Sequence, residues 1–355
     1  MIDKFVSIKA PASLVSMYCT ACHRFSFRIF VNCYLRQCII SSTSYQQSSM
    51  SELAKSETLL AYTDIPPWQQ DSYILRGYRP LSYSYIKSAH SLGYLHNQTI
   101  NIYTHLIGLI FFCLTAYAFQ DTLTSRYHTA SYEDTIVFSS FFAGIFACLG
   151  FSSAFHTFSN HSEAVCQRWL VLDFLGIISL IAGSWVPGVY YGFYCQKGVS
   201  SFYVVMVSII QSVELRRKNW SLIAFKIFSL SAVCATLLLV PHFRTPRWKH
   251  FRTAMFLSLG ISGFFPMTYA AKEFGVAQAH SQMGWGWIIL EAVFYISGAL
   301  VYASQYPEKA WPGSYDFFGS SHQVFHVLVL LGAIAHFTGI VQAFTYNHNP
   351  ITRMC

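Results

Sequence analysis

The sequence Ser321-His322-Gln323-Val324-Phe325-His326 opens a long apolar run, and Ser152-Ser153-Ala154-Phe155-His156 closes another. Asp173 lies near the start of a third apolar run. Ionisable groups within membrane-spanning segments are costly and usually serve a function. We therefore expect these residues to meet at one face of a membrane, and the rest of the chain to build the helices that bring them together.

The composition agrees with a membrane protein. Of the 355 residues, 54% are hydrophobic and 11% are charged, whereas charged residues make up about a quarter of a soluble domain. Aromatic residues reach 17%, as expected where Trp and Tyr lie at both membrane interfaces. The net charge of +8 is spread over termini and loops, which indicates membrane topology and no nucleic-acid partner.

Two segments precede the apolar runs. Residues 1–50 contain an apolar stretch broken by Arg28 and Arg36, so they neither span a membrane nor form a signal peptide. This N-terminal extension is either disordered or not translated, since Met50 offers an alternative start. Residues 51–100 are more polar and combine aromatic residues with Arg and Pro. We expect them to form a cytoplasmic segment along the membrane interface.

Six apolar runs approach the roughly 20 residues that cross a bilayer: residues 102–119, 136–155, 170–194, 254–271, 285–303 and 324–344. Residues 199–240 hold either one further span or two, which gives seven or eight in total. Joining residues 202–210 to 231–241 makes one span of 20 residues, so we interpret residues 211–230 as an insertion.

The distribution of Lys and Arg favours seven spans. With seven, ten Lys and Arg residues fall on one side of the membrane and four on the other, leaving aside three in the disputed region. The positive-inside bias then places the N-terminus in the cytoplasm and a short tail, residues 346–355, outside the cell or in a lumen. The prediction is an all-α polytopic membrane protein, a seven-transmembrane helix bundle over residues 101–345, in the plasma membrane or an endomembrane.

Seven spans bring His156, Asp173, His322 and His326 to the cytoplasmic face; eight would separate them. His322 and His326 are four residues apart, so their rings share one side of a helix, and Ser152 and His156 have the same spacing. Three neutral imidazoles leave a fourth position for water, as in catalytic zinc sites. The predicted intramembrane Zn²⁺ ligands are His156, His322 and His326, and the predicted catalytic residues are Asp173 and Ser152.

Other histidines have different interpretations. The alternative interpretation of His322 and His326 is that they lie at a helix end, form only hydrogen bonds and bind no metal. His161 lies in a loop and is expected to be solvated. His336 is ten residues beyond His326, too deep for the metal site, and is expected to form a hydrogen bond between helices.

At these residues the chain resembles the progestin and adipoQ receptor family, also called the haemolysin III-related family, and its adiponectin-receptor-like branch in particular. The matching blocks are YILRGYRP (73–80), NIYTH (101–105), SSAFHT (152–157), LDFLGI (172–177), GSWVP (183–187) and FFGSSHQVFHV (317–327). The resemblance implies Zn²⁺ held at His156, His322 and His326, water near Asp173 and Ser152, and a cytoplasmic N-terminus. The chain departs from the family's first block at Gln98, where Glu is usual, and at Ile100 and Tyr103.

Two functions from different classes are expected. In one, the protein is a hydrolase in which zinc activates water against a lipid amide such as ceramide, an activity linked to similar family members. In the other, zinc is structural and an extracellular protein or lipid ligand shifts the packing of the helices. A third interpretation, suggested by fungal relatives, is zinc and sterol homeostasis. Membrane lipids are the expected partners, and the glycosylation patterns at Asn97 and Asn160 are expected to stay unmodified because they face the cytosol.

Overall fold

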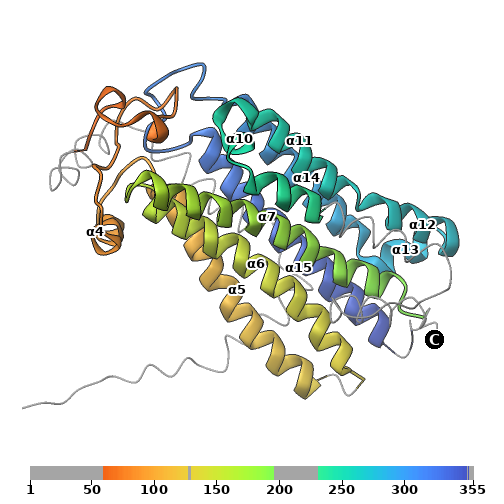
Figure 1. The fold of residues 1–355 in the computed structure, drawn as a ribbon. Helices are drawn as coiled ribbons and strands as arrows, with labels where there is room; N and C mark the ends of the chain where they lie inside the picture. The colour runs from red at the N-terminus through yellow and green to blue at the C-terminus, as the bar shows by residue number, and fades with distance from the viewer. Residues whose placement is uncertain (1–58, 127–128, 196–230, 350, 352–355) are drawn as a thin grey trace, which may run out of the picture. The chain divides into compact units, whose positions relative to one another are not determined.

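The computed structural model describes residues 59–126, 129–195, 231–349 and 351. Over these residues the secondary structure is helical apart from one isolated bridge between Leu60 and Tyr78. Long helices lie side by side in a bundle (Figure 1): α5 (Thr99–Arg126), α6 (Tyr132–Phe158), α7 (Glu163–Gly192), α11 (Lys249–Ile261), α12 (Phe264–Phe274), α14 (Trp285–Ser304) and α15 (Ser321–His348).

Shorter elements connect or precede them: η2 (Tyr62–Asp64), η3 (Pro67–Gln69), α4 (Tyr85–His90), η4 (Ser91–Gly93), α10 (Pro241–Arg244), η5 (Pro246–Trp248) and α13 (Val276–Met283). The segment from residue 59 to residue 98 folds around a small apolar cluster of Ile65, Ile74 and Tyr78. Two further segments for which the sequence made predictions, residues 1–50 and 211–230, lie outside the described residues.

Six helical stretches in the described chain are long and apolar enough to cross a membrane. They contain five of the six predicted runs in full, and the third differs only in its bounds, because α7 begins at Glu163 and ends at Gly192. Helix α6 extends beyond its apolar run at a start that polar side chains cap. At α6, Ser131 and Asp134 form a reciprocal capping box, which satisfies backbone N–H groups that a helix start leaves free.

Helices α6 and α7 form the closest pair in the bundle. Their backbones meet at glycines: a methyl group at Gly144 would lie 2.6 Å from the carbonyl oxygen of Ser179, and one at Gly176 would lie 2.9 Å from that of Ala147. Small residues allow such close approach between membrane helices, where van der Waals packing provides much of the association energy. The site residues on α6 and α7 are therefore carried on a rigid pair.

The fourth of these stretches is not one continuous helix. It comprises η5, α11 and α12, and α11 ends at Ile261 while α12 begins at Phe264. A side chain at Gly263 would collide with the indole of Trp185, so the break brings the backbone against α7. The sequence predicted one run over residues 254–271; the glycines at 260 and 263 mark where it divides.

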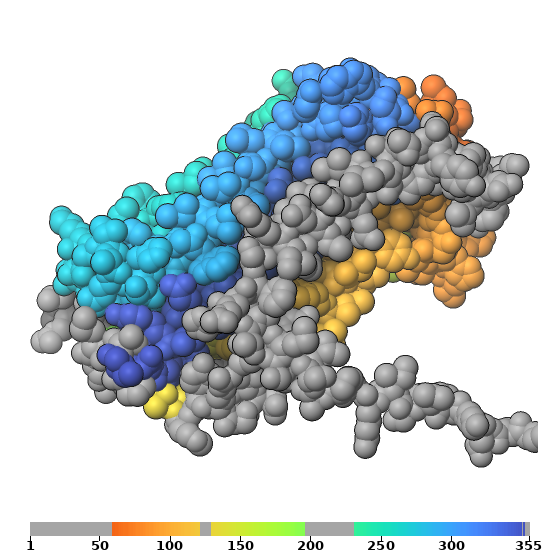
Figure 2. All heavy atoms as spheres, turned by 180° about the vertical axis from the view of Figure 1, so that it is seen from behind, coloured from red at the N-terminus to blue at the C-terminus, as the bar shows by residue number. Residues whose placement is uncertain are grey.

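The outer faces of the bundle are apolar. Ile107, Ile110 and Leu114 of α5 are exposed, as are Val293 and Leu300 of α14. Figure 2 shows the bundle from behind, with α14 in blue on its outer face. Exposed apolar surface of this extent is expected where lipid tails, rather than water, surround the helices.

Candidate metal centre

The three predicted ligands meet at one end of the bundle, which we call the histidine end. His156 lies at the end of α6, and His322 and His326 lie in the first turns of α15. Their ring centroids are 5.0, 4.9 and 4.9 Å apart. One nitrogen from each ring lies within 4.8 Å of the other two, so these histidines could hold a metal ion.

Hydrogen bonds fix the orientation of two of these rings. Nδ1 of His156 lies 2.8 Å from the side-chain oxygen of Gln98, and Nδ1 of His326 lies 3.1 Å from the main-chain oxygen of Asn101. Both oxygens are acceptors, so Nδ1 carries the proton in each ring and Nε2 keeps its lone pair. Metal-ligating histidines generally donate their other N–H in this way.

The arrangement fits a metal ion. Nε2 of His156 is buried and has no hydrogen-bond partner among the described residues, and a buried nitrogen left without a partner costs roughly 1–3 kcal/mol. Three neutral imidazoles suit Zn²⁺, which binds histidine nitrogen at about 2.1 Å in tetrahedral geometry. At that bond length and geometry two nitrogens on one ion are about 3.4 Å apart, so ring movements of about 1 Å from the present spacing of up to 4.8 Å would complete the site.

Arg79 stabilises the end of α6 that carries His156. Its guanidinium is buried and donates to the carbonyl oxygens of His156 and Thr157 at 2.6 and 2.9 Å, and to the hydroxyls of Ser91 and Ser159. Burial lowers the pKa of Arg79 to about 10, so the side chain is still charged at neutral pH. A cation at a helix C-terminus also complements the helix dipole.

Glu308 stabilises the start of α15. The side chain of the N-cap residue Ser320 makes no capping hydrogen bond. Instead, the Glu308 carboxylate accepts hydrogen bonds from the backbone N–H of Ser321, at 2.7 Å, and from the Ser321 hydroxyl. Glu308 itself is buried. Since His322 is the next residue, this contact positions the second ligand.

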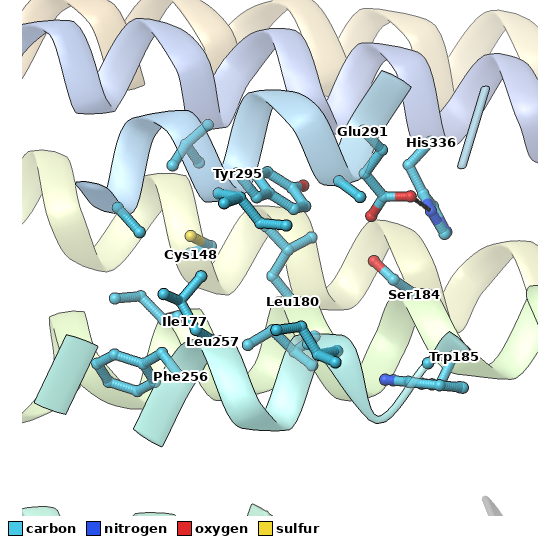
Figure 3. Close-up of a pocket in the computed structure, with 18 of the residues that line it drawn as sticks. Cys148, Ile177, Leu180, Ser184, Trp185, Phe256, Leu257, Glu291, Tyr295 and His336 are labelled. Atoms are coloured by element: carbon cyan, nitrogen blue, oxygen red, sulfur yellow. Dashed lines mark hydrogen bonds and ion pairs between the residues drawn. The ribbon is translucent and has the colours of Figure 1, made fainter. Parts of the chain in front are cut away.

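Asp173 and Ser152 line a cavity of about 240 Å³ that also reaches His322 and His326. The Ser152 and Asp173 side chains lie beside each other there. The cavity continues away from the histidine end between α7, α11, α12, α14 and α15, and its walls there are mostly apolar. Figure 3 shows this deeper part, with Ile177, Leu180 and Leu257 among its lining residues.

His105 of α5 belongs to the site, although the sequence analysis gave it no role. Its ring stacks on that of His326, with centroids 3.7 Å apart and an interplanar angle of 8°. Both of its nitrogens are buried without a hydrogen-bond partner, and the ring lines the cavity. An ionisable residue inside an apolar span was the signal that could have identified it.

Two other histidines bear on the sequence analysis. His336 was expected to form a hydrogen bond between helices, and this prediction is confirmed: its Nδ1 lies 2.6 Å from a carboxylate oxygen of Glu291 on α14. His161 is only partly exposed and its ring packs on Tyr85, so it is less solvated than expected. Asn97 and Asn160 are both buried.

Comparison with known proteins points to one family. The haemolysin-III related family matches residues 93–337, which include His105, His156, His322 and His326, here called the histidine cluster. The chain is 36% identical to an adiponectin receptor protein of Drosophila melanogaster over 287 residues, 81% of this chain and 60% of that protein. It is also 36% identical to progestin and adipoQ receptor-like protein 1 of Caenorhabditis elegans over 283 residues, again 60% of that protein.

A fungal relative is matched over most of its length. The ADIPOR-like receptor IZH2 of Saccharomyces cerevisiae is 32% identical over 303 residues, 84% of this chain and 89% of that protein. The chain thus spans only about 60% of the length of the two animal relatives. With the helical bundle and the histidine cluster in place, these matches show that the chain is an integral, multi-pass membrane protein of the haemolysin-III related (progestin and adipoQ receptor) family, in its adiponectin-receptor-like branch.

Proposed function

We propose that this protein is a receptor-type membrane protein that binds Zn²⁺ at His156, His322 and His326 and hydrolyses a lipid amide, with ceramide as the substrate to test. The observation that carries the proposal is the apolar cavity that opens onto the histidines. A structural zinc site is closed by its four ligands, whereas a catalytic site keeps one position open. A cavity walled by apolar side chains suits the acyl chain of a lipid.

The residues would act as follows. A zinc ion at this site supplies Lewis-acid polarisation of the amide carbonyl. Asp173 accepts a proton from the attacking water and passes it to the leaving amine, and Ser152 holds the Asp173 carboxylate in place. The apolar walls exclude other water. Water thus adds to the carbonyl carbon, the C–N bond breaks, and a fatty acid and an amine leave.

Seven spans remain our proposal for the topology. Gln98 at the start of α5 contacts His156, so α5 begins at the histidine end and α6 returns to it. Helix α7 then runs to the opposite end, whereas α11 begins at the histidine end, where Lys249 lies over the ring of Tyr302 beside His322. We therefore propose one further crossing between α7 and α11.

The described part of that crossing is helical. Residues 231–239 form a helix whose Cys234 and Leu238 pack with Phe174 of α7 and Leu259 of α11. We therefore place the fourth span before α11, and residues 59–98 on the side of the membrane that carries the histidines. Cys195, which follows α7 at the opposite end, is disulfide-bonded. Disulfides persist in oxidising compartments, which supports a cytoplasmic histidine end together with the charge distribution.

A receptor that does not catalyse is the second candidate, because the relatives from Drosophila and Saccharomyces are named as receptors. In that case zinc stabilises the bundle and an extracellular protein or a lipid shifts the packing of its helices. The cavity would then hold the lipid without cleaving it.

Ceramide turnover by the purified, zinc-loaded protein distinguishes the two. We expect Asp173→Ala to keep zinc and lose activity by about 100-fold or more, and His326→Ala to lose both. His161→Ala is the matched control, since that ring also lies at the histidine end but outside the cluster. Equal turnover by wild type and Asp173→Ala would exclude hydrolysis at this site. An inactive wild type that still requires zinc for stability would favour the receptor without catalysis.

A further inference from the structure

Among the described residues, three buried polar atoms in the cavity have no hydrogen-bond partner. They are the hydroxyl oxygen of Ser184, the hydroxyl oxygen of Tyr295 and Nε2 of His336, and all three residues line the cavity. They come from α7, α14 and α15 respectively. Figure 3 shows them in the deep part of the cavity, together with Glu291. Because more than nine in ten buried polar groups have a partner, three without one in the same cavity call for a ligand.

Contacts between α14 and α15 place two of these atoms about one helix turn apart along the cavity. Glu291 and Tyr295 are four residues apart on α14, so they share one side of that helix. The Glu291 carboxylate contacts His336 at 2.6 Å. The Tyr295 ring packs against Gly332, one turn before His336, where a larger residue would collide with it.

Contacts through α6 place the third atom there as well. The ring of Phe141 lies 5.3 Å from that of His336. Its neighbour Ser140 donates a hydrogen bond to the carbonyl oxygen of Gly183, the residue before Ser184. The three atoms therefore lie within about one helix turn of one another along the cavity.

The deepest of the three atoms, on His336, is far from the histidine end. His336 is ten residues beyond His326 on the same helix, which corresponds to about 15 Å along the axis. Between them α15 presents Val329 to the cavity, and α7 presents Ile177 and Leu180. An occupant with a polar headgroup at the histidines would thus cross an apolar stretch before it reached the three polar atoms.

The hydrogen-bond chemistry specifies the group expected at this depth. The Glu291 carboxylate accepts from Nδ1 of His336, so in the neutral ring Nε2 is an acceptor and needs a donor. The Ser184 and Tyr295 hydroxyls can each donate to an oxygen. A hydroxyl group has the donor and the acceptor lone pairs that the three need, because it can donate to His336 and accept from the other two. A ketone oxygen cannot donate and would leave Nε2 unsatisfied.

We propose that the cavity selects a lipid whose chain carries a hydroxyl group about 15 Å from its polar headgroup. An extended chain advances roughly 1.2 Å per bond, so the hydroxyl lies near carbon 12 of an acyl chain. The inference depends on the proposed function only in placing the headgroup at the histidine centre. A water molecule is the competing occupant, because it too can bridge buried polar atoms.

Binding of three fatty acids to the purified full-length protein tests the proposal. Stearic acid, 12-hydroxystearic acid and 12-oxostearic acid are compared by displacement of radiolabelled stearic acid. We expect the hydroxy acid to bind about 10-fold more tightly than the other two, as one or two net hydrogen bonds would give. Equal binding of all three, or binding of none, would overturn the proposal; equal binding would assign the three atoms to water. Tighter binding of the oxo acid would overturn it as well, and would indicate that Nε2 of His336 is protonated.

Mild variants separate recognition from folding. Ser184→Ala and Tyr295→Phe each delete an atom that has no protein partner, so both should fold, and each should lower the preference for the hydroxy acid by roughly 2- to 10-fold. Ile288→Val changes an apolar lining residue on α14 and should keep the preference. Unchanged preference in both hydroxyl variants would overturn the proposal.

The proposed hydrolysis and the proposed hydroxyl site can be tested independently of each other. His326→Ala should bind all three acids more weakly yet retain the relative preference for the hydroxy acid. A wild type that shows this preference but does not turn over ceramide would refute the hydrolase and leave the hydroxyl site standing. Ceramide turnover without a preference for the hydroxy acid would support the hydrolase and refute the hydroxyl site.

Discussion

Replacing Gln98 with Leu tests whether the neighbours of the histidines determine metal binding. The Gln98 side-chain oxygen accepts from Nδ1 of His156 and from the side-chain amide of Asn101, both at 2.8 Å. Leucine has a similar size but no acceptor. The variant leaves the His156 N–H without a partner in a buried site and removes the bond that presents Nε2 to the metal.

We expect the Gln98→Leu protein to fold and to bind zinc about 10- to 100-fold more weakly, the usual cost of losing such a partner. This corresponds to roughly 1.4–2.7 kcal/mol. Gln98→Glu is the matched control, because a carboxylate accepts the same hydrogen bond more strongly and should hold zinc at least as tightly as wild type. Affinity is measured by competition with a chelator, and folding by a thermal melt of the zinc-free protein. Equal affinity in the Leu variant would refute the assignment of Gln98 as the group that orients His156.

Three further changes give measurable outcomes. Glu308→Gln replaces the carboxylate that caps α15 with a neutral amide. It should lower the free energy of unfolding by about 1–3 kcal/mol and therefore lower the melting temperature; an unchanged melting temperature would contradict this capping role. Burial lowers the pKa of His96 from 6.5 to about 2. Between these two pH values the unfolded chain binds more protons than the folded chain. The free energy of unfolding therefore falls as the pH drops below 6.5, by up to about 1.4 kcal/mol per pH unit. The His96→Asn protein should lose less stability than wild type between pH 6.5 and 5, and parallel curves would exclude His96 as the cause. Gly144→Ala places a methyl group 2.6 Å from the oxygen of Ser179 and should cost about 1–3 kcal/mol, whereas Gly150→Ala, with its nearest atom at 3.8 Å, should melt like wild type.

The sequence predicted the parts of the fold that depend on local pattern. Apolar runs of spanning length correspond to helices because a helix is the way a single segment satisfies its backbone within lipid. The spacing of His322 and His326 placed both rings on one helix face. Counting crossings then brought His156 to the same end, 5.0 Å from His322 between ring centroids.

The neighbours of the site could not be read from local pattern. Gln98 and His156 are 58 residues apart, and Arg79 reaches His156 across 77 residues. Such contacts depend on how helices are rotated and on where the preceding segment folds back. The position of Glu308 against the start of α15 is equally a tertiary contact. Gln98 entered the sequence analysis only as a departure from the family pattern, whereas in the structure it holds a candidate ligand.

A second buried polar cluster shows why burial alone does not identify a ligand site. At the end of the bundle opposite the histidines, one carboxylate oxygen of Asp134 accepts from the Tyr191 hydroxyl at 2.8 Å and lies 3.1 Å from Nε2 of His348. Nδ1 of His348 contacts the hydroxyl of Thr129. Both nitrogens of this histidine are therefore satisfied by the protein, and among the described residues this cluster has no buried side-chain atom without a partner.

Helices α6 and α15 contribute residues to both clusters, so the two clusters can be compared directly. Nε2 of His156 has no partner, and a bound ion would recover the free energy that this costs, whereas Asp134 already binds its neighbours. We expect Asp134→Ala to leave Tyr191 and His348 unsatisfied and to cost about 3 kcal/mol or more of folding free energy, while zinc affinity stays at the wild-type value. Melting temperature and zinc stoichiometry measured on one preparation would check both. A variant that melts like wild type but loses zinc would reverse the roles we assign to the two ends.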